Sequence, residues 1–117
     1  MSTLQRTRDT MRDFLGKAQT LTASGAVLPG VACVNLAHAT VVVAATIEDA
    51  ANHRGFLAVV DTSASGTAAH TLTLAKGTFD GTNNVATLNA AAESLLVHFD
   101  DEGNGTIIIT TGSVALS

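Results

Sequence analysis

The chain divides into two segments that differ in their pattern of hydrophobic and polar positions. In residues 1–18 the apolar side chains recur at the spacing of an α-helix. The residues on this apolar face are Leu4, Met11, Leu15 and Ala18, with Phe14 beside them. From residue 19 onward, short runs rich in β-branched residues alternate with turn sequences. The pattern predicts a short N-terminal helical or extended arm over residues 1–18 and a β-rich body over residues 19–117.

The body is predicted to form a series of short strands separated by turns. The expected strands are 19–23, 31–36, 40–46, 56–61, 70–75, 85–88, 95–100, 106–111 and 113–116. Turn-forming residues lie between them, as in Leu28-Pro29-Gly30 and in the Asp- and Gly-rich stretches 80–84 and 101–105. Strand signals at this density are typical of an all-β fold. They predict a small β-sandwich or a jelly-roll-like barrel.

The alternation within the strands predicts which residues face the core. In 70–75, Leu72 and Leu74 point one way and the intervening threonines point the other way. In 95–100, the core side is expected to hold Leu95, Val97 and Phe99. In contrast, 40–46 and 107–109 are apolar at successive positions, which is typical of strands covered on both sides. These two segments are therefore expected to be central or interface strands, with a second subunit as the covering layer.

Charge is divided unevenly between the arm and the body. Residues 1–17 hold four cations and two acids, a net charge of +2. The remainder holds Arg54 and Lys76 against eight acids, a net charge of −6, and the whole chain carries −4. Only 14% of residues are charged and 3% are aromatic, whereas 46% are hydrophobic. An aliphatic core in so small a domain buries little area per residue, which favours self-association.

The composition also bears on where the protein is found and what it binds. The mean hydropathy is +0.33, yet no apolar run approaches the length of about 20 residues that a membrane span needs. The N-terminus lacks the apolar stretch of a secretory signal, and the single cysteine, Cys33, is interpreted as a small buried residue. We therefore expect synthesis in a cytoplasm and no membrane partner. The acidic body without Tyr or Trp disfavours nucleic acid as a partner.

Motifs that carry chemistry are scarce. The four histidines lack metal-ligand spacing and are interpreted mainly as turn or strand-surface residues. Residues 100–105 begin like a calcium loop, but position 12 is Thr111 instead of Glu, so a β-hairpin turn is preferred over a weak cation site. Neither a nucleophile motif nor a phosphate-binding loop is present. We expect no catalytic residues, no metal, no cofactor and no enzymatic activity.

The arm supplies the residues expected to bind another protein. Its apolar face offers anchors, and its arginines offer charges to acidic groups on a partner. The alternative for the arginines is a solvated helix face, because two aspartates are interleaved with them. The expected capsid- or subunit-binding residues are Leu4, Arg6, Arg8, Met11, Arg12, Phe14 and Leu15.

Three segments of the body, 20–30, 59–90 and 94–117, resemble small virion structural proteins of tailed bacteriophages. Members of this group are most often head decoration (cement) proteins and sometimes parts of fibres or spikes. The resemblance implies a β-rich, usually trimeric body that sits over junctions between major capsid proteins. It implies no catalytic residues.

Taken together, these observations predict a bacteriophage head decoration protein. It would form a homotrimer on the exterior of the capsid and stabilise it by bridging major capsid proteins. The alternative is a fibre or spike module that binds a host-surface glycan, although aromatic residues, which usually stack on sugars, are few.

Overall fold

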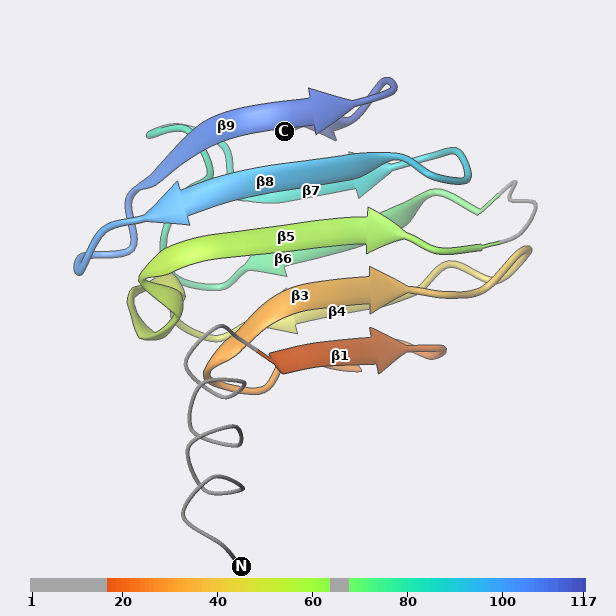
Figure 1. Ribbon diagram of the computed structural model, residues 1–117, viewed down its shortest axis with the longest axis horizontal. Helices are drawn as coiled ribbons and strands as arrows, with labels where there is room; N and C mark the ends of the chain where they lie inside the picture. Colours follow the sequence, from red (N-terminus) through yellow and green to blue (C-terminus); the bar gives the residue numbers. More distant parts are fainter. Residues whose placement is uncertain (1–16, 64–67) are drawn as a thin grey trace, which may run out of the picture.

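A computed structural model describes residues 17–63 and 68–117, and these residues form an all-β sandwich of two five-stranded sheets (Figure 1). The strands of the first sheet, sheet A, are in spatial order β1 (Lys17–Leu21), β3 (Val31–Leu36), β5 (Gly55–Asp61), β8 (Ser94–Phe99) and β9 (Gly105–Thr111). Those of the second, sheet B, are β10 (Ala115–Leu116), β7 (Val85–Leu88), β6 (His70–Leu74), β4 (Ala44–Ile47) and β2 (Gly25–Ala26). The predicted all-β sandwich is confirmed.

The chain passes alternately between the two sheets through its first six strands. β1, β3 and β5 pair in parallel in sheet A, while β2, β4 and β6 pair in parallel in sheet B. Each successive pair of strands therefore makes one turn of a coil. Antiparallel pairing then closes the fold, with β7 against β6, β8 against β5, and β9 against β8. The mixed pairing distinguishes this sandwich from sheets built only of antiparallel hairpins.

The core lies between the inner faces of the two sheets and follows the predicted alternation. Leu72 and Leu74 of β6 are fully buried, and so are Val97 and Phe99 of β8. Phe99 packs at 6.1 Å between ring centroids from Phe79, which lies in the loop after β6. Each fully buried aliphatic or aromatic side chain contributes about 1.5–3 kcal/mol, so this interior is the main source of stability.

The structure corrects the boundaries of several predicted strands, and the largest correction concerns 40–46. Residues 40–43 lie outside any strand, and β4 begins only at Ala44. Val41 and Val42 are exposed in the connecting segment, whereas Val43 is buried in the core. A run of β-branched residues was therefore misread as one long strand, because its first part connects the two sheets. The short strand β2 was also missed.

Two loops are held by aspartate side chains, and the hairpin turn predicted at residues 100–105 is confirmed. Residues Ala50–His53 form a 3-10 helix whose first turn is capped by the Asp49 carboxylate, which accepts a hydrogen bond from the Ala51 N–H. The segment between β8 and β9 is a hairpin turn, and Asp100 Oδ1 accepts the N–H groups of Glu102 and Asn104. These bonds use the Asp100 carboxylate to hold the turn.

Candidate functional site

The predicted binding residues of the arm, from Leu4 to Leu15, lie outside the described residues. The described chain begins at Lys17, the first residue of β1, and β1 is an edge strand of sheet A. The place where the arm joins the body is therefore defined. It is one edge of sheet A, at the end of the sandwich where β3 and β5 also begin.

The outer face of sheet A, which points away from the core, is a mainly apolar surface on regular structure. The strand registers place one row of side chains across all five strands, and this row is Ala18, Cys33, Ala58, Leu96 and Ile109. None of these residues is polar apart from the weakly polar thiol. Except for Lys17 at the start of β1, the strands of sheet A place no Lys, Arg, Asp or Glu on this face.

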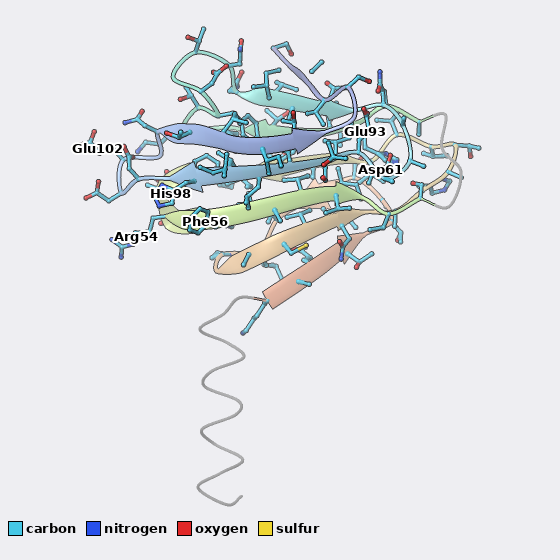
Figure 2. The ribbon with its side chains drawn as sticks, turned by 45° about the horizontal axis from the view of Figure 1, so that its top comes forward. Arg54, Phe56, Asp61, Glu93, His98 and Glu102 are labelled. Atoms are coloured by element: carbon cyan, nitrogen blue, oxygen red, sulfur yellow. The ribbon has the colours of Figure 1, made fainter. Side chains whose placement is uncertain are left out.

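Two large side chains of this face are unusually exposed for their type. Phe56 of β5 is 61% exposed and Ile109 of β9 is 60% exposed. Phe56 lies opposite His98 of β8, and the two rings make an edge-to-face contact with centroids 5.0 Å apart (Figure 2). Leu96 of β8 is half-buried, and its register partner in β9 is Ile109. Contiguous exposed apolar residues on a rigid sheet mark an interaction surface, whereas scattered ones do not.

Strand β9 extends this surface to the edge of the sheet. It lies at the end of sheet A and has a bulge at Ile108, which has no register partner in β8. Ile107 packs on the core, while Ile108 is 51% exposed. The segment 107–109 is therefore apolar on both sides of the sheet, but it is an edge strand and not a central one. That its exposed side is an interface stays a prediction.

The outer face of sheet B differs in chemistry. Its registers bring Thr46 next to Thr73, and Thr71 next to Thr87, so the face consists mainly of threonine and alanine. The strands of sheet B contain no charged residue. Apart from Lys17, the strands thus place no charged side chain on either outer face, but only that of sheet A carries exposed large apolar side chains.

Charge is confined to the ends of the sandwich. Figure 2 shows Arg54 and Glu102 at one end, with Asp61 and Glu93 at the other. The acids at the first end lie in loops: Glu48, Asp49, Asp80, Asp100, Asp101 and Glu102. One exposed ion pair, between Lys76 and Asp49 at 3.8 Å, belongs to this end and contributes little to stability. We call this the acidic end.

The opposite end contains a buried polar cluster that brings together a serine, a histidine and an aspartate. Ser63 Oγ lies 3.3 Å from His70 Nε2, which lies 4.0 Å from Asp61 Oδ1. His70 Nδ1 accepts the Val43 N–H at 2.9 Å, so Nε2 carries the proton and donates to the His38 carbonyl at 2.8 Å. Sequence reasoning missed this cluster, because Ser63 and His70 lie seven positions apart in the chain and form no recognisable motif.

The cluster does not have the geometry of a catalytic triad. In a triad the acid and the serine contact opposite nitrogens of the imidazole, whereas here both lie on the Nε2 side. His70 is completely buried, and both its nitrogens are held by backbone groups. The cluster therefore fastens residues 38–43 to β6. Asp61 Oδ1 accepts the Ser63 N–H, and its Oδ2 has no hydrogen-bond partner among the described residues.

Two of the earlier interpretations of ionisable side chains need correction. His70 and His53 are buried, not surface residues, and burial lowers the pKa of His53, although a backbone contact with Val31 opposes this effect. Cys33 is only partly buried and lies on the outer face of sheet A, because Val34 and Leu36 occupy the core side of β3. Partial burial raises the pKa of its thiol.

Glu93 is the most extensively bonded side chain at this end. Its Oε1 accepts the N–H groups of Asn89 and Ala90 at 2.7 and 3.0 Å. Its Oε2 accepts both the N–H and the hydroxyl of Ser113. Burial by itself raises the pKa of Glu93, but the four hydrogen bonds outweigh burial and hold the pKa below its ordinary value. Glu93 therefore joins the turn after β7 to the turn after β9.

The described part of the chain contains neither a metal-binding cluster nor a membrane-spanning helix. Within residues 17–63 and 68–117, no three His, Cys, Asp or Glu side chains are grouped so that they would hold a metal ion. Among the helices of these same residues, none has the length and apolar character needed to cross a membrane.

Comparisons with known proteins give no relative for this chain. No family model matches, and neither a curated protein nor a solved structure is significantly similar. The chemistry of the candidate site is therefore inferred from its own geometry.

Proposed function

We propose that this protein is a bacteriophage head decoration (cement) protein, which self-associates and stabilises the capsid by bridging major capsid proteins. The observation that carries the proposal is the outer face of sheet A, where Phe56, Leu96 and Ile109 stand on rigid strands with no Lys, Arg, Asp or Glu among them. The resemblance of the body to virion proteins supports the same function.

The physical reasoning follows from how interfaces are built. The cores of protein interfaces are depleted of charged residues, and their energy is concentrated in a few large anchors. Phe56 and Ile109 are anchors of this kind, because strand pairing holds them in place and little ordering entropy is lost on binding. Exposed charge is confined mainly to loops at the acidic end, so it does not oppose contact on this face.

In the proposed assembly the body is a homotrimer on the capsid exterior, and the arm adds further contacts. The apolar residues Leu4, Met11, Phe14 and Leu15 would act as anchors, while Arg6, Arg8 and Arg12 would meet carboxylates of the major capsid protein. A subunit that contacts neighbouring capsid proteins adds interface area across their junctions, which resists the outward pressure of packaged DNA.

The test compares an added carboxylate on each sheet. Ile109→Glu places a charge in the proposed interface, and Thr73→Glu places the same charge on the outer face of sheet B as a matched control. Light scattering after size exclusion measures the mass, and cosedimentation with empty capsids of the encoding phage measures binding. We expect a trimer for the wild-type chain and for Thr73→Glu. Ile109→Glu should weaken binding at least tenfold, about 1.4 kcal/mol.

Equal trimer formation and capsid binding by both variants would contradict the role of this face. Failure of the wild-type chain to bind capsids, with a monomeric mass, would contradict the decoration function itself. Circular dichroism of each variant checks that the body remains folded.

One observation favours a second candidate, a fibre or spike module that binds a host glycan. Phe56 is exposed beside His98, and an exposed aromatic ring of this kind can stack on the apolar face of a sugar. A glycan-array signal that is lost in Phe56→Ala, in a chain that does not bind capsids, would favour this candidate over decoration.

A further inference from the structure

We propose that residues 1–16 of the chain bind across the outer face of sheet A of their own body, over Cys33, Ala58 and Leu96. The inference deepens the proposed function, since it says what covers the interaction surface before the protein is assembled. It depends on the geometry of the face and the sequence of the segment. It does not depend on the identity of the capsid.

The first argument is the position from which the segment departs. It joins β1 at Lys17, and the next residue, Ala18, is the first member of the apolar row that continues through Cys33 to Ile109. Gly16 immediately precedes this strand, and glycine permits the sharp change of direction that a return over the face requires. The direct covalent connection gives the segment a high effective concentration at the face.

The second argument is length. The sequence predicts a helix over residues 2–15, and 14 residues at 1.5 Å each give about 21 Å. Four inter-strand spacings of about 4.8 Å make sheet A about 19 Å wide between β1 and β9. A helix of this length would cover the row from one edge to the other. Its apolar residues Leu4, Met11 and Leu15 share one side. Arg8 lies on this side between Leu4 and Met11, so its side chain would have to extend along the sheet, away from the apolar row.

The third argument is charge. Arg8 lies nine residues before Lys17, about 14 Å along a helix, and β8 lies three strand spacings, also about 14 Å, from β1. The hairpin that follows β8 carries Asp100, Asp101 and Glu102 at the acidic end. The arginines of the segment would therefore reach the part of sheet A nearest to the acids.

The area of the face favours the segment over a second copy stacked face to face. With strands of about six residues and about 3.3 Å per residue, the face measures about 19 by 20 Å, or about 400 Å². A stable interface needs about 800 Å² on each partner. The face alone is thus about half of what a dimer requires, whereas a single helix of about 10 Å diameter fits within it.

Cys33 provides a native probe, because it is the only cysteine and its side chain lies in the row that the segment would cover. The experiment measures the rate at which Ellman's reagent modifies this thiol at pH 8.5, at concentrations where light scattering gives a monomeric mass, so that subunit contacts do not protect the thiol. The full-length variant Met11→Asp/Leu15→Asp removes the apolar contacts. Its matched control, Ser2→Asp/Thr10→Asp, adds the same charge away from the apolar side of the predicted helix.

We expect Met11→Asp/Leu15→Asp to react at least ten times faster than the wild-type chain, and the control to react like the wild type. Equal rates in all three proteins would overturn the inference, and they would leave the capsid-binding assay to decide the proposed function. Protection that disappears on dilution would also overturn it, because the covering segment would then belong to another copy. Thr73→Cys in a Cys33→Ser background reports on sheet B, and its rate should not respond to the arm variants.

Discussion

The hydrogen bonds of Glu93 give a prediction whose magnitude follows from the structure. Glu93 is 3% exposed, and its carboxylate accepts four hydrogen bonds from Asn89, Ala90 and Ser113. Each hydrogen bond to a charged group is worth about 1.5–3 kcal/mol, but these contributions are not additive, and Asn89, Ala90 and Ser113 are exposed enough for water to replace part of the loss. We expect Glu93→Ala to lower the free energy of unfolding by about 3–4 kcal/mol at pH 7.

Glu93→Gln is a more conservative change that tests the charge itself. The amide keeps one acceptor for Asn89 and Ala90, but its NH₂ group faces the Ser113 donors and cannot accept from them. We expect a loss of about 2 kcal/mol, measured by urea denaturation. A loss of this size shifts the midpoint of thermal unfolding by about 6–10 °C in a domain of this length.

The pH dependence gives the sign of the electrostatic contribution. The pKa of Glu93 is lower in the folded chain than its ordinary value of 4.5. The stabilisation is therefore fully present above pH 4.5, and it is lost as the pH falls through the folded-state pKa. The difference in stability between wild type and Glu93→Gln should shrink in acid. A difference below 1 kcal/mol at pH 7, or one that stays constant down to pH 3, would refute the reasoning.

Two further predictions concern packing and the buried histidine. Gly105→Ala should lower the free energy of unfolding by about 2 kcal/mol or more in urea titrations. The added Cβ would lie 2.5 Å from the backbone oxygen of Thr78 and 2.6 Å from that of Phe79, which is too close. An unchanged unfolding midpoint would contradict this close approach. His70→Phe replaces the imidazole by a somewhat larger apolar ring and leaves the buried Val43 N–H without its acceptor, so it should cost about 2–4 kcal/mol. Slow hydrogen exchange that persists at the Val43 amide would argue against the role of His70.

Local pattern was sufficient wherever one side of a strand faces the core. The alternation of Leu72 and Leu74 with threonines placed β6 correctly, because strand side chains point to opposite faces with a period of two. The turn sequence after Asp100 likewise identified the β8–β9 hairpin, since glycine and asparagine accept the backbone angles of tight turns. The all-β class, the core residues of these strands and the turns were thus readable from the sequence.

Prediction from the local pattern failed where similar neighbouring residues have different places in the fold. Val41, Val42 and Val43 have equal strand propensity, yet only Val43 is buried, because the chain crosses between the sheets at this point. The partners of His70 were invisible for a similar reason: the contacts join residues that the sequence separates by up to 32 positions. The position of Cys33 on the outer face of sheet A depends on which side of β3 meets the core.

The sequence alone determined that the body is an aliphatic all-β domain of low charge with a charged arm, because composition and short-range periodicity are local properties. Only the tertiary structure decided the parallel coil of the first six strands and the registers that align Ala18, Cys33, Ala58, Leu96 and Ile109 in one row. These residues come from five strands spread over most of the chain. Their meeting on one surface depends on long-range pairing, and no local signal encodes it.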